Sequence, residues 1–203
     1  MVNFNESNTK TNLMRAFAGE SQARNRYTFA AEIAKKQGLY VIEAVFNLTA
    51  NQELAHANVF MKDLSDLNGE TVEIDGGYPV EVTNSVVELL ENAHHHEMEE
   101  YGDIYKSFAE EAEREGQMAV AASYKDIAEI EKEHANRFEL FGKLLKENKL
   151  FISDVKCEWM CLNCGHIYNG EKVPEVCPVC HHEKGYFVRI ELAPYCQKRN
   201  SDC

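Results

Sequence analysis

The sequence has few basic residues, and it contains no apolar run long enough to cross a membrane. Its 21 Lys and Arg residues are outnumbered by 34 Asp and Glu residues, which gives a formal net charge of −13. Nucleic acids and anionic membranes bind clustered basic side chains, so we expect neither as a partner. The N-terminus lacks the basic and apolar regions of a signal peptide, and a membrane-spanning helix needs about 20 apolar residues. These absences predict a cytoplasmic protein.

Cysteine is absent from the first 156 residues, although the chain contains 7 cysteines. Four of them form two Cys-x-x-Cys pairs, Cys161 with Cys164 and Cys177 with Cys180. In an intracellular chain this pattern favours metal binding over disulfide bonds. Four thiolates form a tetrahedral site that suits zinc or iron, and the spacing alone does not separate a zinc ribbon from a rubredoxin.

Three cysteines lie outside these pairs: Cys157, Cys196 and Cys203. We expect Cys157 to be a thiol that binds no metal, because it precedes Cys161 by four residues (161 − 157) and belongs to no pair. The other two cysteines fall in the C-terminal tail, for which the residues suggest no function.

Helix-breaking residues are scarce as well, with only 4 prolines and 11 glycines in the chain. Apolar residues recur at helical spacing in four segments, which predict helices over 7–38, 40–67, 84–115 and 117–148. The segment 68–79 is rich in glycine and too long for a tight turn, so it is interpreted as a crossover connection. Short, long and short connections between four helices are typical of a ferritin-like four-helix bundle.

The composition changes after the fourth helix, where cysteine, proline and glycine become frequent. A core this small usually needs a metal to stabilise it. The prediction is therefore a mainly α protein with a small metal-ribbon domain. Its parts are a bundle domain (1–149), a linker (150–156), the ribbon domain (157–193) and a tail (194–203).

The buried seams of the predicted helices carry carboxylates and imidazoles. In a repeated set, a lone glutamate precedes each of two Glu-x-x-His motifs: Glu20, Glu53, His56, Glu97, Glu131 and His134. On a four-helix bundle such a set forms one two-metal site in the core, with half from each helix pair. Ligands rich in oxygen, with one imidazole per metal, suit iron or manganese.

The third helix adds a further carboxylate, Glu100, one turn beyond Glu97. The stripe that contains Glu97 is predicted to continue through Ile104 and Phe108 on the same buried face.

A single buried glutamate or histidine is more often a hydrogen-bonded core residue than a ligand, and Glu20 could pair with Arg24 four residues later. An ionised carboxylate inside a core is strongly disfavoured unless it is paired or bound to metal. Because five glutamates and two histidines converge here, ordinary hydrogen bonds and one ion pair would satisfy only a small part of the set.

Three consecutive histidines, His94, His95 and His96, precede Glu97. On a helix they point in three directions, so at most one can face a metal site. We expect them to form a solvated polar surface.

The run from Ala16 to Tyr27, AFAGESQARNRY, resembles the first helix of the rubrerythrins. Glu97-x-x-Glu100-Tyr101 and Glu131-x-x-His134 resemble the ligand motifs of that family. The resemblance covers nearly the whole chain. It implies a ferritin-like diiron domain fused to a C-terminal rubredoxin-like domain.

The resemblance also implies roles for individual residues of the diiron site. Glu53 and Glu131 are implied to bridge the two irons, while one terminal glutamate and one histidine complete each iron, Glu20 with His56 and Glu97 with His134.

Further roles implied by the resemblance belong to residues that move or support the ligands. Glu100 is implied to exchange with His56 on the first iron as the site changes oxidation state. Tyr27 and Tyr105 are implied to form hydrogen bonds with ligand carboxylates.

The cysteine pairs resemble those of rubredoxin, with Cys-x-x-Cys-Gly followed by Cys-Pro-x-Cys. Trp159, Tyr168 and Phe187 are expected to form the aromatic shell of such a domain. Beside a diiron bundle, one iron in an FeS4 site is favoured over zinc, although recombinant protein can acquire zinc instead.

The activity implied is that of a non-haem peroxidase in oxidative-stress defence, which reduces hydrogen peroxide to water with electrons delivered through the FeS4 centre. The implied electron donors are an NAD(P)H:rubredoxin reductase and a free rubredoxin, and the implied assembly is a homodimer or a higher homo-oligomer. No Gly-x-Gly-x-x-Gly fingerprint is present, so direct NADH binding is not expected.

Three other interpretations stay open at this point. They are a ferroxidase or iron-storing ferritin-like protein, a simple electron carrier, and a structural bundle with a zinc-ribbon interaction module.

Overall fold

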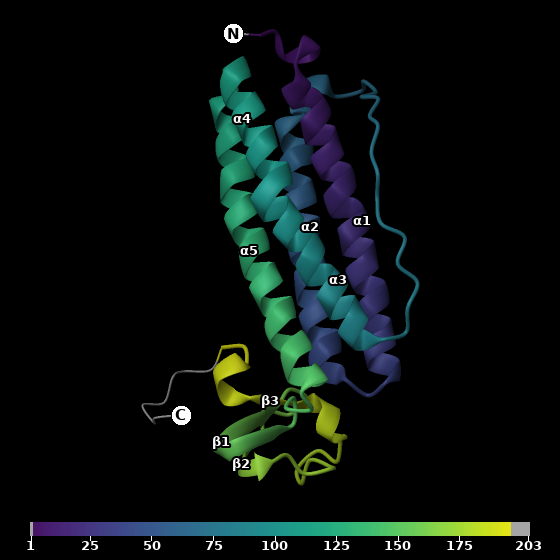
Figure 1. The fold of residues 1–203 in the computed structure, drawn as a ribbon, viewed down its shortest axis with the longest axis vertical. Helices are drawn as coiled ribbons and strands as arrows, with labels where there is room; N and C mark the ends of the chain where they lie inside the picture. The colour runs from purple at the N-terminus through teal and green to yellow at the C-terminus, as the bar shows by residue number, and fades with distance from the viewer. Residues whose placement is uncertain (1, 196–203) are drawn as a thin grey trace.

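The long helical segments lie side by side, and a small β-sheet covers one end of them (Figure 1). The structure is a computed structural model that describes residues 2–195. The prediction of a mainly α fold with a long crossover is confirmed. Three segments are continuous helices, and the other is built from α3, η3 and α4: α1 Asn8–Lys36, α2 Tyr40–Asp63, α3 Val86–Glu99, η3 Glu100–Ile104, α4 Tyr105–Glu115 and α5 Met118–Lys146.

Local sequence signals set the helix ends. The Ser7 hydroxyl accepts a hydrogen bond from the Lys10 amide and caps the start of α1. Gly38 and Gly116, with φ of 71° and 83°, follow α1 and α4 in the left-handed conformation that glycine adopts readily. The second helix ends earlier than predicted, at Asp63, and Ser65–Leu67 forms a 3-10 turn instead. Serine and aspartate have low helix propensity because their side chains can compete for backbone hydrogen bonds, so Ser65 and Asp66 favour a turn over a further helical turn.

The third helix is not the continuous α-helix predicted over 84–115. The segment η3 is π-helical, and its wider turn shifts the register of everything that follows. Ile104, expected on the buried seam, is therefore 38% exposed, whereas Tyr105 is 1% exposed. The buried face continues from Tyr105 through Ala109 and Ala112, and Phe108 is only partly buried.

The crossover between α2 and α3 runs along the outer side of α1 (Figure 1). It is tied to the helices at two points. Asp75 forms an ion pair with Arg15 of α1. Glu81 lies 3.5 Å from Arg26 Nη1 and 2.7 Å from His96 Nε2, which joins the crossover to α1 and α3.

The C-terminal sheet has the order β2-β1-β3, with antiparallel pairs between β1 Ile152–Cys161, β2 Ile167–Lys172 and β3 Phe187–Arg189. The first strand begins inside the segment 150–156, for which the sequence predicts a linker. Trp159 and Phe187 are fully buried, and the Trp159 indole donates to the Gly170 carbonyl at 2.9 Å. Cys157 is buried in the same core.

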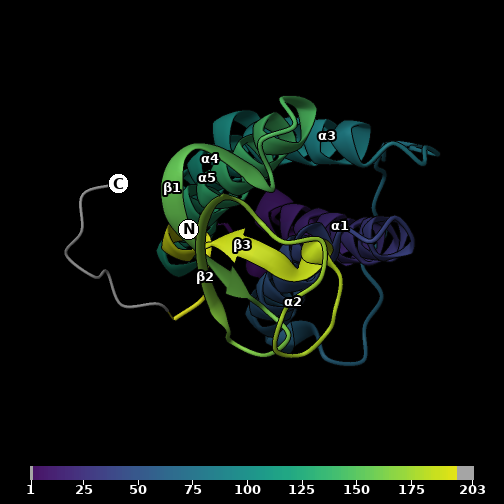
Figure 2. The ribbon, with the colours of Figure 1, turned by 90° about the horizontal axis from the view of Figure 1, so that it is seen from below.

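The sheet packs against the lower end of the bundle, where the view from below shows it under α2 and α5 (Figure 2). Leu150 and Val188 join the apolar core of the bundle. Tyr186 stacks on Tyr40 of α2 with ring centroids 4.0 Å apart. At Gly185, an added Cβ would lie 1.7 Å from the Gly38 carbonyl oxygen, so the close approach of the two backbones requires glycine.

None of the helices within residues 2–195 is both long and apolar enough to cross a membrane.

Replacing Gly185 with alanine tests this contact between the domains. Gly185→Ala is expected to destabilise the protein by about 1–3 kcal/mol, because the new Cβ meets backbone that cannot turn away. Thermal unfolding of the full chain measures the effect. Gly170→Ala is the matched control, because the three atoms nearest its added Cβ all belong to the side chain of Tyr168, which can rotate. Equal stability of the two variants would contradict the docking contact.

Candidate metal centres

Six ligand-type side chains converge in the middle of the bundle. Helix α1 contributes one, α2 two, α3 one and α5 two, and each is at most 6% exposed: Glu20, Glu53, His56, Glu97, Glu131 and His134. They form two overlapping groups whose donor atoms all lie within 4.8 Å of one another. Glu53 and Glu131 belong to both groups. The structure therefore brings together every residue of the repeated set found in the sequence.

Each of the two shared glutamates contacts both histidines. His56 Nδ1 lies 3.0 Å from Glu53 Oε2 and 2.9 Å from Glu131 Oε1. His134 Nδ1 lies 2.9 Å from Glu53 Oε1 and 2.8 Å from Glu131 Oε2. One oxygen of each carboxylate thus faces each imidazole, which is the arrangement that lets a carboxylate bridge two metal ions.

The lone glutamates complete the two groups. Glu20 Oε1 lies 3.9 Å from His56 Nδ1, and Glu97 Oε2 lies 3.8 Å from His134 Nδ1. The two halves therefore each contain one terminal carboxylate and one imidazole.

Many of these buried polar atoms lack a hydrogen-bond partner within residues 2–195. They include both oxygens of Glu131 and both ring nitrogens of His134, together with one oxygen each of Glu20, Glu53 and Glu97. Unpaired buried polar atoms are rare and costly. Two ligands bound at about 2.1 Å to one ion and at right angles to each other are about 3.0 Å apart. The donor set therefore fits two metal ions.

Without metal, the charges of the cluster strongly perturb one another. Burial raises the pKa of Glu20 and Glu97, and neighbouring carboxylates raise it further. Burial opposes ionisation of Glu53 too, but the close imidazoles of His134 and His56, 2.9 and 3.0 Å from its oxygens, outweigh it and lower its pKa to about 2. The histidines respond oppositely: burial lowers their pKa, but Glu131 and Glu53 raise it to about 9 for His56 and about 12 for His134.

Two buried tyrosines donate hydrogen bonds to the terminal glutamates. The Tyr27 hydroxyl donates to Glu97 Oε1, and the Tyr105 hydroxyl donates to Glu20 Oε1. These are the contacts with ligand carboxylates that the family resemblance implied. Burial and the adjacent carboxylates raise the pKa of both phenols well above its ordinary value, so both remain protonated donors.

Glu100 lies beside the cluster and outside both groups of converging ligands. It is the first residue of η3 and is partly exposed, whereas the other six are buried. Burial of its carboxyl group and repulsion from Glu97 and Glu131 raise its pKa well above the usual range. Its carboxyl group therefore lies close enough to interact electrostatically with the cluster, although it belongs to neither group of ligands.

The three consecutive histidines contribute no ligand to either group. His94 Nδ1 contacts the Ala135 carbonyl at 3.1 Å, His95 is exposed, and His96 contacts Glu81 of the crossover. Arg24 is exposed, whereas Glu20 is fully buried and accepts its hydrogen bond from Tyr105 instead.

Arg137 is a residue near the site that the sequence pattern did not single out. Its guanidinium donates to Thr49 Oγ1 and Gln52 Oε1, each at 3.0 Å. It follows His134 by three residues (137 − 134), which places it about one helical turn further along the same face. That spacing could have indicated a residue close to the site. Burial lowers the pKa of Arg137, and the nearby carboxylates of Glu97 and Glu53 partly offset this effect. Arg137 therefore adds a positive charge near the cluster.

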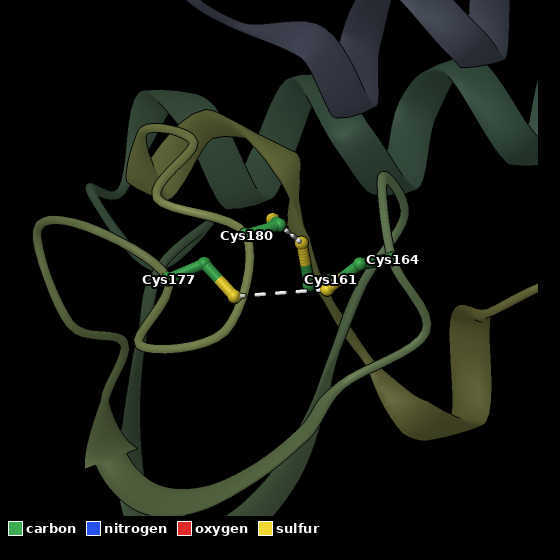
Figure 3. Close-up of side chains that lie close together, drawn as sticks. All are labelled: Cys161, Cys164, Cys177 and Cys180. Carbon is green, nitrogen blue, oxygen red and sulfur yellow. Dashed lines mark hydrogen bonds between the residues drawn. The ribbon is translucent and has the colours of Figure 1, made fainter.

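The four paired cysteines meet at one point in the small domain (Figure 3). The sulfurs of Cys161 and Cys180 are 3.8 Å apart, as are those of Cys164 and Cys177. Four sulfurs about 2.3 Å from a central ion form a tetrahedron with edges of about 3.8 Å. The separations therefore fit one tetrahedral metal ion.

The thiols differ in their surroundings. Cys161 and Cys177 are fully buried, while Cys164 is exposed. Burial raises the pKa of Cys161 to about 12, whereas a hydrogen bond from the His182 backbone helps to lower that of Cys180 to about 5. Cys157 lies outside the cluster, and Cys196 and Cys203 fall outside the described residues.

Fold and sites together define a class of protein: a four-helix bundle with a carboxylate-bridged two-metal core, joined to a tetracysteine metal domain. Comparison with known families agrees. Residues 11–141 match the rubrerythrin family, and residues 159–188 match the rubrerythrin rubredoxin-like domain.

Individual relatives extend along most of the chain. Rubrerythrin-1 of Clostridium acetobutylicum is 46% identical, with 92% of this chain and 96% of the relative covered. The rubrerythrin of Nitratidesulfovibrio vulgaris is 38% identical, and the match covers 92% of this chain and 96% of that relative. A solved structure of nigerythrin in a mixed-valence state superimposes with a TM-score of 0.62 at 26% identity, covering 91% of this chain and 90% of that one.

The chain belongs to the rubrerythrin family. Its buried carboxylate–imidazole cluster is the diiron site of that family, and its four cysteines form the rubredoxin-like FeS4 site.

Two neighbouring tyrosines allow a matched test of the hydrogen bond to Glu20. Tyr105→Phe is expected to destabilise the protein by about 1–3 kcal/mol, because it leaves a buried carboxylate oxygen without its donor. Tyr124 is equally buried and stacks near Tyr105, but its hydroxyl has no hydrogen-bond partner among residues 2–195. Tyr124→Phe should therefore be neutral or stabilising in the same denaturant titration. Equal losses in both variants would show that ring packing, and not the hydrogen bond, causes the effect.

Proposed function

We propose that this protein is a peroxidase of oxidative-stress defence that reduces hydrogen peroxide to water. The reaction takes up two electrons and two protons, breaks the O–O bond and releases two waters. The observation that carries the proposal is the presence, in one chain, of a buried two-metal cluster with two shared carboxylates and a separate four-cysteine site. When bound, an iron pair supplies both electrons at once, and a single FeS4 iron replaces them one at a time.

The residues around the cluster have distinct tasks in this proposal. Tyr27 and Tyr105 hold Glu97 and Glu20 in place, because their hydroxyls donate hydrogen bonds to these two carboxylates. The apolar cores on either side of the cluster keep water out.

Glu100 is the carboxylate proposed to move: with metal bound, it would serve as a ligand in one oxidation state of the site, in the place that His56 would hold in the other. Its position at the start of a π-helical turn supports this role, because such turns are often found at functional sites. Its partial exposure and its charge repulsion with the cluster are consistent with a ligand that binds in only one state of the site.

The proposed electron route includes a second copy of the chain. Tyr40 lies at the end of α2 that contacts the small domain, and Glu53 of the metal cluster follows it by 13 residues (53 − 40). Roughly 20 Å of helix therefore separates the small domain from the cluster within one chain. An apolar groove between α2, α5 and the small domain includes Leu48, Leu140 and Leu162. Leu48 and Leu140 are 50% and 39% exposed, which supports a homodimer or a higher homo-oligomer with this surface covered.

The remaining partners are proposed from the family resemblance. NAD(P)H is the expected source of electrons, through a separate rubredoxin reductase and a free rubredoxin. The proposed location is the cytoplasm, whose reducing conditions keep metal-binding cysteines from forming disulfides.

The direct test is a peroxide assay without oxygen. Protein with iron at both sites should consume peroxide at the expense of NADH when a rubredoxin reductase is supplied. Turnover no faster than that of free iron would contradict the proposal. Iron loading far above three per chain, in large soluble shells, would point instead to a ferritin-like storage role.

Two variants separate the contributions of the two sites. Glu131→Ala should lose the diiron site and peroxide turnover, and should keep the visible absorption of the FeS4 iron. Cys177→Ser should lose that absorption and steady-state turnover with the reductase. After chemical reduction it should still consume about one peroxide per iron pair, since two electrons suffice for one O–O bond. Full steady-state activity in either variant would show that the site assignment is wrong.

A further inference from the structure

A cavity of about 590 Å³ lies between α1, the crossover and the interrupted third helix. Its inner wall includes Glu100 and Tyr105, and the Tyr105 hydroxyl donates to the ligand Glu20. A molecule in this cavity is therefore separated from Glu20 by one residue, Tyr105.

The size of the cavity exceeds what hydrogen peroxide needs. One water occupies about 30 Å³ in the liquid, and hydrogen peroxide has only two heavy atoms. Pockets for small organic ligands have volumes of about 300–1,000 Å³. The cavity therefore falls in the range of sites that hold an organic molecule.

The wall of the cavity is largely apolar. Ala16 and Gly19 of α1 form one side, and Pro79 of the crossover forms another. Ile104 and Phe108 contribute from the third helix. The π-helical turn places them there, since a regular helix would direct Ile104 into the bundle core.

The crossover is held in position as the outer wall. The ion pair of Asp75 with Arg15 fixes one end of the cavity, and the contacts of Glu81 with Arg26 and His96 fix the other. Half of the residues around the cavity are polar or charged, among them Gln22, Asp103 and Ser107. The lining therefore suits a ligand that carries both a polar group and an apolar part.

We propose that organic hydroperoxides with a short alkyl or aryl tail are substrates of this protein, and that the cavity holds the tail. The proposal rests on the peroxidase function proposed above. In the reaction the O–O bond breaks, two electrons come from the reduced iron pair, and each oxygen takes one proton. The products are the corresponding alcohol and water.

Gly19 provides the sharpest test of the cavity. A Cβ at this position would meet nothing within 4 Å, so a side chain there extends into the open space. Gly19→Leu is expected to fill part of the cavity, while Gly19→Ala adds one methyl group and improves helix propensity by about 1 kcal/mol. Ile104→Trp narrows the same space from the opposite side and serves as a second variant if Gly19→Leu does not fold.

The first measurement needs no turnover. Cumyl alcohol is an inert analogue of cumene hydroperoxide, and its binding to zinc-loaded, full-length protein is measured by calorimetry. The wild type and Gly19→Ala should bind it, and Gly19→Leu should bind it roughly tenfold or more weakly. No binding to the wild type, or equal binding to all variants, would overturn the proposal.

The second measurement compares two substrates on the iron-loaded protein. The ratio of kcat/KM for cumene hydroperoxide to that for hydrogen peroxide should fall roughly tenfold or more in Gly19→Leu and stay constant in Gly19→Ala. Turnover of hydrogen peroxide alone by the wild type would overturn the inference about the tail and leave the peroxidase function intact. Turnover of neither peroxide would contradict the peroxidase function itself, and the binding measurement would still report on the cavity.

Discussion

The burial of ionisable groups at the centre of the bundle is the constraint on which the rest of the structure depends. Four glutamates and two histidines lie in a layer almost closed to solvent. An apolar cluster with Phe46 and Phe138 lies on one side of this layer, and another with Phe60 and Tyr124 lies on the other. Without metal, the charged layer would be held between two water-free regions at high cost. The bundle therefore acquires its full stability only when the layer is neutralised.

The layer has approximate two-fold symmetry, which the third helix breaks. Tyr27 donates to Glu97 from one apolar cluster, and Tyr105 donates to Glu20 from the other. Each half of the site thus has the same support. Glu100 has no counterpart in the repeated motif, and it lies where the π-helical turn widens the third helix. The same turn contributes Glu100 to the wall of the cavity and moves Ile104 out of the core, so a single local irregularity accounts for the asymmetry.

Helical periodicity singled out the residues that converge in the bundle, because a carboxylate on a buried apolar stripe is costly unless a metal or a cation neutralises it. The helical pattern and the cost of burying a charge were enough to identify Glu20, Glu53 and Glu131 as members of the cluster. The π-helical turn was missed because the apolar Ile104 continued the expected stripe. Contacts such as Glu81 with His96 depend on the path of the crossover, which local patterns do not encode. The early start of the first strand at Ile152 was missed for a similar reason, since its residues pair with a distant strand.

The arrangement of the four helices separates the substrate side of the proposed site from its electron side. The cavity that leads to Glu100 is bounded by α1 and the third helix, whereas the apolar groove beside the cysteine domain is bounded by α2 and α5. Both histidines come from α2 and α5, and the terminal carboxylates come from α1 and α3. A carboxylate can accept and release protons as charge changes, so it suits the side where peroxide oxygens need them. In the proposed reaction, peroxide and reductant would approach the cluster from different sides of the bundle and would not compete for one opening.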